Sequence, residues 1–261
     1  MEQFICLSGL PRAGSTLLSA ILSQNPLIHA EGNSAVCQLM WDTQQSCLTS
    51  SKEQLLANGR EKTTVHDLIS QIPHTYYKNS SEKIVVDKCR SWTIQANIDM
   101  LHKYIDKNYK IIILERSITD IVKSFVKLYK KNGSHDNITD IEYKLLTPNS
   151  EPIMRSISGV NWAKKNNQNN HFLFINYEDL INNAKETIEK IYKFCEWAPF
   201  THNFNEVSCK YPEDDSVYGL KGMHNIHHKV AKRENNVVLS NKTSERCAKI
   251  DTLMGYLPQK T

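Results

Sequence analysis

Four short runs of mainly hydrophobic residues are spread along the chain, and each is followed by small or polar residues. Short runs of this kind are typical of strands buried on both faces of a parallel sheet. Between and after them, hydrophobic residues recur every three or four positions, which predicts helices. The runs that we expect to be strands are Phe4–Leu7, Lys83–Val86, Ile111–Leu114 and Phe172–Ile175.

The helical pattern follows every one of these runs. Leu17 to Leu22 predicts a first helix that ends before Pro26, because the residue before a proline disfavours helical geometry. Further amphipathic helices are expected over 92–105, from Ile118 to Val126, and after the fourth run. Alternating strands and helices predict an α/β fold, in which a P-loop-type central parallel β-sheet is flanked by helices on both faces.

The last part of the chain has a different pattern. From about residue 200, periodicity is weak and His, Lys and Asn are frequent. We expect a single domain, 1–261, with a core over 1–197 and a less regular C-terminal segment, 198–261, over the site. A disordered tail is the alternative for this segment.

Composition limits the classes of function. The 261 residues carry 32 Lys and Arg against 28 Asp and Glu, so the net charge of +4 is too small to indicate nucleic-acid binding. Seven cysteines without a C-x-x-C pair predict reduced thiols rather than disulfides or a zinc site. Without a basic signal region or an apolar run of 18 residues, we expect a cytoplasmic protein with no membrane span.

The clearest chemical motif follows the first predicted strand. Gly9 to Thr16 reads G-L-P-R-A-G-S-T, with the two glycines spaced as in a phosphate-binding loop. The backbone N–H groups at the start of the following helix favour an anion, and Arg12, Ser15 and Thr16 add donors. Because Ser15 stands where a nucleotide kinase has lysine, the loop fits a short anionic group better than a triphosphate with Mg²⁺.

A second pair of polar residues follows the third predicted strand. Arg116 lies just beyond its end, and Ser124 lies eight positions later in the next helix. Carboxyl ends of parallel strands form the ligand-binding edge in this class of fold. A loop arginine and a helix serine at this edge are suited to binding one phosphate group together.

Together these motifs resemble the sulfotransferases that use 3′-phosphoadenosine 5′-phosphosulfate (PAPS). The P-R-A-G-S-T segment is similar to the family's 5′-phosphosulfate loop, and Arg116 with Ser124 is similar to its 3′-phosphate pair. Tyr177-Glu178-Asp179-Leu180 resembles the Y-E-D-L segment whose tyrosine lies near the adenine. The resemblance implies PAPS as cofactor, bound by residues Arg12, Ala13, Gly14, Ser15, Thr16, Arg116, Ser124, Tyr177, Lys221 and Lys229.

Some positions depart from the cytosolic small-molecule enzymes of this family. Arg12 stands where those enzymes have lysine, which is closer to the tyrosylprotein, bacterial and carbohydrate-type branches. Their catalytic histidine has no counterpart in the stretch from Val86 to Trp92. Their C-terminal R-K-G element is also missing, and the nearest basic substitute is Gly219 to His224 with Lys229.

In-line sulfuryl transfer needs a base for the acceptor hydroxyl and cations for the departing phosphate. The cation candidates are Arg12 and Lys88. Glu31 is the first candidate for the base, because the tyrosylprotein branch has a glutamate in this region, in what we expect to be a loop. The alternatives are His29, His224 and Asp87.

No metal is expected. Sulfuryl transfer does not require a divalent ion, and His224-x-x-His227-His228 lacks nearby acidic or cysteine ligands. The predicted reaction moves a sulfuryl group from PAPS to a hydroxyl of a carbohydrate, a peptide tyrosine or a small molecule. A P-loop kinase for a nucleotide or small metabolite is the alternative enzyme, and a nucleotide-binding scaffold is the non-enzymatic one. The sequence leaves the acceptor and the oligomeric state open.

Overall fold

The centre of the molecule is a five-stranded sheet in the order β2-β3-β1-β4-β5, and every neighbouring pair of strands is parallel. The structure, a computed structural model, describes residues 1–148 and 152–257. All five residues of the β4 strand are buried, as the apolar run predicted. The strands are β1 (Gln3–Gly9), β2 (Ile28–Asn33), β3 (Ile84–Lys88), β4 (Ile111–Glu115) and β5 (Phe172–Asn176).

The strand register brings the expected chemical segments to one edge of the sheet. Gly9 pairs with Leu114, and Glu115 pairs with Asn176 on the next strand. On the other side of β1, Leu7 pairs with Lys88, which in turn pairs with Asn33. The loop after β1, Lys88, Arg116 and Tyr177 therefore share the carboxyl edge.

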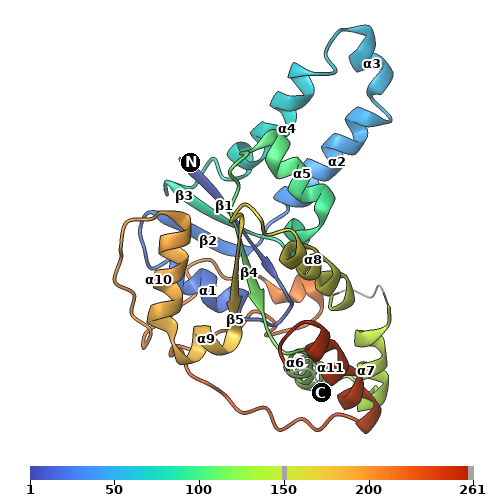
Figure 1. Ribbon diagram of the computed structural model, residues 1–261, viewed down its shortest axis with the longest axis vertical. Coiled ribbons are helices and arrows are strands. Elements are labelled where there is room, and N and C mark those ends of the chain that lie inside the picture. Colours follow the sequence, from blue (N-terminus) through green and yellow to red (C-terminus); the bar gives the residue numbers. More distant parts are fainter. Residues whose placement is uncertain (149–151, 258–261) are drawn as a thin grey trace.

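Helices cover both faces of the sheet, so the predicted fold class is confirmed (Figure 1). In Figure 1, α1 (Ser15–Leu22), α9 (Tyr177–Asn182) and α10 (Ala184–Cys195) lie to one side of the strands. The opposite side carries α5 (Gln95–Tyr104) and α8 (Met154–Lys165). The remaining elements near the sheet are α6 (Ile118–Lys131), α7 (Ile138–Leu146) and the short 3-10 helix η1 (Arg90–Thr93).

Three local predictions were wrong. Residues 28–33 form strand β2 rather than a loop, because main-chain pairing with β3 holds a segment whose polar residues interrupt the apolar pattern. The helix expected over 92–105 is divided into η1 and α5, since Ile94 has an extended backbone. The helix expected after the fourth strand is divided at Asn183, whose φ of −131° and ψ of 50° are not helical.

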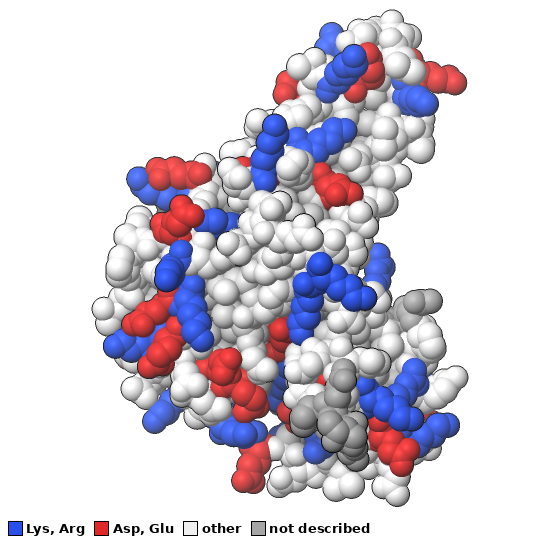
Figure 2. Space-filling model, in the orientation of Figure 1, with Lys and Arg blue, Asp and Glu red and all other residues white. Residues whose placement is uncertain are grey.

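Residues 36–76 form an arm that projects from the sheet, made of α2 (Val36–Leu48), α3 (Lys52–Ala57) and α4 (Thr63–Tyr76) (Figure 1). At the foot of this arm, Tyr77 reaches the sheet and donates to Asp87 at 2.8 Å. Figure 2 shows acidic and basic side chains interspersed over the arm and the body on the face in view. That face has no broad surface of a single charge.

The C-terminal segment returns across the carboxyl edge of the sheet. Residues 198–240 are mainly irregular, with one 3-10 helix, η2 (Asp215–Tyr218), and the chain then forms α11 (Asn241–Leu253). Asp251 of α11 accepts from Ser117 at 3.0 Å and from the Ile118 N–H at 2.5 Å. Its carboxylate thus satisfies free donors at the N-terminus of α6, the helix that carries Ser124.

Candidate active site

The loop between β1 and α1 is held in a conformation that requires glycine. Gly9 has a φ of 125°, and a Cβ atom there would lie 2.1 Å from the Leu114 carbonyl oxygen. Gly14 has a φ of 90° and caps α1, so the first N–H groups of that helix face the space enclosed by the loop. This turn presents backbone donors to an anion, together with the hydroxyls of Ser15 and Thr16.

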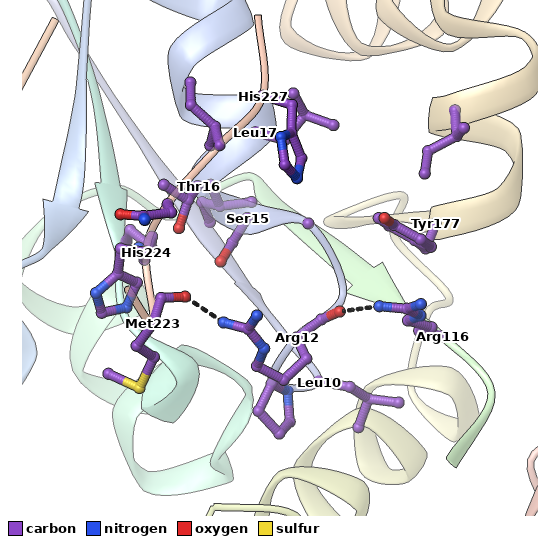
Figure 3. Close-up of a pocket in the computed structure, with 18 of the residues that line it drawn as sticks. Leu10, Arg12, Ser15, Thr16, Leu17, Arg116, Tyr177, Met223, His224 and His227 are labelled. Atoms are coloured by element: carbon purple, nitrogen blue, oxygen red, sulfur yellow. Dashed lines mark hydrogen bonds between the residues drawn. The ribbon is translucent and has the colours of Figure 1, made fainter. Parts of the chain in front are cut away.

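Two arginines and a tyrosine form a connected chain beside this loop (Figure 3). The Arg116 guanidinium donates to the Arg12 carbonyl at 2.9 Å, and its Cζ lies 4.0 Å from the centre of the Tyr177 ring. Arg12 in turn donates from Nε to the Ser124 hydroxyl at 3.1 Å. Ser124 is thus joined to Arg116 through Arg12, not by a direct contact.

Both guanidinium groups are short of anionic partners. Burial, followed by the neighbouring charge of Arg116, lowers the pKa of Arg12. Nε of Arg116 is buried and has no hydrogen-bond partner among the described residues. A buried donor without a partner is costly, so this position favours a ligand that accepts hydrogen bonds.

The pocket around these groups is strongly cationic. Of the described residues that line it, none is Asp or Glu, whereas six are basic: Arg12, Lys88, Arg90, Arg116, Lys229 and Arg233. Leu17, Tyr177 and Ile181 contribute apolar walls. Such a pocket fits a polyanion that also carries a planar, less polar part.

The C-terminal segment closes one side of this pocket. The Met223 carbonyl accepts a hydrogen bond from Arg12 (Figure 3), and residues 223–227 and 229–231 line the pocket. The irregular C-terminal segment therefore lies over the site, as we expected.

Lys88 lies at the end of β3 and forms a buried ion pair with that segment. Its Nζ is 3.1 Å from Oε2 of Glu213, and their side chains are 5% and 12% exposed. Burial lowers the pKa of Lys88, while Glu213 opposes this change. Glu213 also accepts from the Asn33 backbone N–H at 3.0 Å, so it fixes the segment to the ends of β2 and β3.

His224 follows on the same segment and is held by Asp215. Its Nδ1 lies 2.6 Å from Oδ1 of Asp215, and its backbone N–H donates to Oδ2 at 3.0 Å. Burial, then the nearby charge of Lys88, lowers the pKa of the imidazole. Within the described parts of the chain, Nε2 has no hydrogen-bond partner, and the residue lines the pocket.

The sequence matches the sulfotransferase family over residues 4–202. The chain belongs to this family. Comparison of the sulfotransferase with curated proteins gives no sequence match.

Solved sulfotransferase structures have the same fold at low sequence identity. The sulfotransferase domain from the curacin biosynthetic pathway has a TM-score of 0.60 at 16% identity, over 97% of this chain and 97% of its own. The sulfotransferase domain of the Synechococcus PCC 7002 olefin synthase has a TM-score of 0.54 at 17% identity, over 95% and 94%. Mouse sulfotransferase SULT7A1, complexed with PAP, has a TM-score of 0.55 at 14% identity, over 97% and 84%.

Most of the site residues predicted from the sequence of this sulfotransferase lie around one pocket. Arg12, Gly14, Ser15, Thr16, Lys88, Arg116, Tyr177 and Lys229 all line the pocket. Ala13 is buried in the core beside the pocket. Ser124 accepts a hydrogen bond from Arg12 but does not itself line the pocket. Lys221 is exposed, and its carbonyl accepts a hydrogen bond from the Asn132 side chain at 3.1 Å.

Three of the base candidates, Glu31, His29 and Asp87, lie in other networks. Oε2 of Glu31 is 3.0 Å from Nε2 of His29, and neither residue is among the described residues that line the pocket. Asp87 is fully buried and accepts from Ser34, Tyr77 and Trp92 at 2.5–2.8 Å. Because three side chains donate to its carboxylate, Asp87 anchors those side chains to the end of β3.

Sequence reasoning missed Arg90, Glu213, Asp215 and Arg233. The last three lie in the segment without periodicity, and no local motif marks them. Among the described residues, no group of three His, Cys, Asp or Glu side chains has a metal-binding arrangement. None of the helices described has both the length and the apolar character needed to cross a bilayer.

Proposed function

We propose that this sulfotransferase moves a sulfuryl group from PAPS to an acceptor hydroxyl by in-line displacement. The observation that carries the proposal is the pocket itself, which combines a phosphate-type loop with six basic side chains and no carboxylate among its described lining residues. PAPS carries a 5′-phosphosulfate, a 3′-phosphate and an adenine on one ribose, which matches the charge and the apolar walls of this pocket.

The proposed cofactor contacts follow the geometry of the edge. The loop 9–16 holds the 5′-phosphosulfate through its N–H groups, Ser15 and Thr16. Arg116, through its unpartnered Nε, and Ser124 hold the 3′-phosphate, with Lys229 beside them. Tyr177 lies near the adenine. Bound PAPS supplies an activated sulfuryl group with a phosphate leaving group.

We propose His224 as the general base, in preference to Glu31. Asp215 accepts the hydrogen bond from Nδ1, which leaves the Nε2 lone pair free to take the acceptor's proton. Burial and the charge of Lys88 lower the pKa of His224, which favours the neutral imidazole that a base needs. His224 also lines the pocket, whereas Glu31 is bonded to His29 outside it.

Lys88 and Arg12 are the proposed cations for the developing charge. Lys88 is held in place by Glu213, and Arg12 by Ser124 and Met223. Because both side chains are already oriented, little reorganisation is needed when negative charge builds on the leaving group. The acceptor class, carbohydrate, peptide tyrosine or small molecule, is not fixed by these contacts. The seven free cysteines support a cytoplasmic site of action.

Thermal shift with two nucleotides tests the proposal. A ligand that binds the folded state raises the melting temperature according to its concentration and affinity. Adenosine 3′,5′-bisphosphate should stabilise the protein, and ATP with Mg²⁺ should have little effect. The reverse pattern would support the kinase instead. Transfer of labelled sulfate from PAPS to any hydroxyl compound would separate an enzyme from a nucleotide-binding scaffold.

A further inference from the structure

The strand order divides the pocket into two halves on either side of β1. Arg116 and Tyr177 follow β4 and β5, so the proposed cofactor extends from the loop after β1 in that direction. The other half is formed by the ends of β3 and β2, which contribute Lys88, Arg90 and Asn33. The acceptor must enter this second half, because the sulfuryl group has to point away from the nucleotide for in-line transfer.

The two cations of the acceptor half have different surroundings. The charge of Lys88 is already balanced by Glu213 at 3.1 Å. Arg90 is exposed, lines the pocket, and forms no ion pair within the described part of the chain. It lies close enough to Lys88 that its charge helps to lower the pKa of that lysine.

The backbone of Arg90 is held in place by hydrogen bonds to its carbonyl. Its carbonyl accepts from the Ser8 hydroxyl at 2.9 Å and from the Thr93 hydroxyl at 3.2 Å. The Ser8 bond joins the start of η1 to β1, one residue before the phosphate-type loop begins, and the Thr93 bond lies within η1. The main chain of Arg90 is therefore held at the carboxyl edge of the sheet.

The distribution of cations between the two halves of the pocket indicates the charge of the group that Arg90 would bind. The cofactor half has its own cations for the phosphates of PAPS, namely Arg12, Arg116, Lys229 and Arg233. Lys232 next to them pairs with Glu178 at 3.2 Å, which places this stretch beside α9 on the cofactor side. Arg90 is thus left over, with neither a carboxylate of the chain nor a cofactor phosphate to neutralise it.

We propose that the acceptor is an anionic hydroxyl compound and that Arg90 binds its carboxylate, phosphate or sulfate group. This inference rests on the proposed sulfotransfer and names the substrate class for the same site. An arginine fork pairs with such groups through two parallel hydrogen bonds, which orients the acceptor as well as attracting it. Neutral and cationic analogues of the same hydroxyl would lack this contact.

Matched acceptors test the proposal. The panel contains a phenol, a primary alcohol and a sugar, each as a carboxylate, as the neutral amide and as an amine. We expect the carboxylate form of at least one scaffold to have the highest kcat/KM, and Arg90→Gln to remove its advantage by raising KM about tenfold or more. Arg90→Lys should keep part of the preference, and Arg60→Gln, at the exposed end of the arm, should keep all of it.

The nucleotide controls separate this proposal from the proposed function. Arg90→Gln should bind adenosine 3′,5′-bisphosphate as the unmodified protein does, and a weaker affinity would assign Arg90 to the cofactor and overturn the inference. Equal kcat/KM for carboxylate and amide forms would also overturn it while leaving sulfotransfer intact. If no scaffold is sulfated, thermal shift of the bisphosphate complex decides, and the absence of added stabilisation by any carboxylate contradicts the proposal.

Discussion

One carboxylate, that of Asp215, binds His224 twice, through the ring Nδ1 at 2.6 Å and through the backbone N–H at 3.0 Å. The two bonds fix both the ring and the main chain that carries it. They also define the tautomer in which Nε2 is the acceptor. In the proposed mechanism, Asp215 therefore acts through His224, as a positioning residue.

Asp215→Asn should lower kcat and leave the affinity for adenosine 3′,5′-bisphosphate nearly unchanged. The amide has a similar shape, but it can donate to Nδ1 and so favour the unproductive tautomer. His224→Gln should lower kcat further, by roughly 10²–10⁴-fold, since it removes the base itself. Steady-state kinetics and a nucleotide titration measure the two effects. The control is Asp214→Asn, because Asp214 is exposed and bonds to Ser216 instead.

The pH dependence of kcat/KM should have its acidic limb below the ordinary histidine value of about 6.5. Burial and Lys88 lower the pKa of His224, so protonation inactivates the base only at lower pH. Asp215 opposes that lowering, and its neutralisation in Asp215→Asn should move the limb to still lower pH. A limb that stays in place in Asp215→Asn and His224→Gln would assign the base to another residue.

Arg116→Ala should weaken the binding of adenosine 3′,5′-bisphosphate by about 1.5–3 kcal/mol, the range for hydrogen bonds to charged groups. Arg116→Lys should recover only part of this loss, because an ammonium group does not stack on Tyr177 as a planar guanidinium does. Isothermal titration gives both values. Wild-type affinity in Arg116→Ala would remove this residue from the site.

Gly32→Ala tests the ion pair between Lys88 and Glu213. A Cβ at residue 32 would lie 2.1 Å from Cγ of Glu213, so the glutamate has to move away from the lysine. We expect a loss of about 1–3 kcal/mol in the free energy of unfolding, the usual cost of overpacking. Thermal or urea unfolding measures it. In a Glu213→Ala background the same change should cost much less, and equal costs in both backgrounds would contradict the clash.

The sheet and the loop after β1 could be predicted because their signals are local. β4 is a continuous apolar run that is buried throughout, and Gly9 and Gly14 stand where the chain has positive φ. β2 was missed because His29, Glu31 and Asn33 interrupt the apolar pattern of a strand held by main-chain pairing. Burial of a polar strand depends on its neighbours, which a single sequence does not display.

The partners within the site could not be predicted in the same way. The sequence paired Arg116 with Ser124, whereas the structure places Arg12 between them. Asp215 and His224 are only nine residues apart, yet their contact depends on the turn of η2 and on Glu213 anchoring the segment to Asn33. Contacts of this kind arise from the path of an irregular segment, for which periodicity gives no information.

The family match ends at residue 202, but Glu213, Asp215 and His224 all come later in the chain. During synthesis the ribosome releases the strands and the glycine turn first, and the groups that close the pocket emerge afterwards. A growing polypeptide would thus contain the loop 9–16 and Arg116 before it contains Lys229, Arg233 and the proposed base His224. The proposed reaction therefore depends on a segment that is made only after all five strands of the sheet.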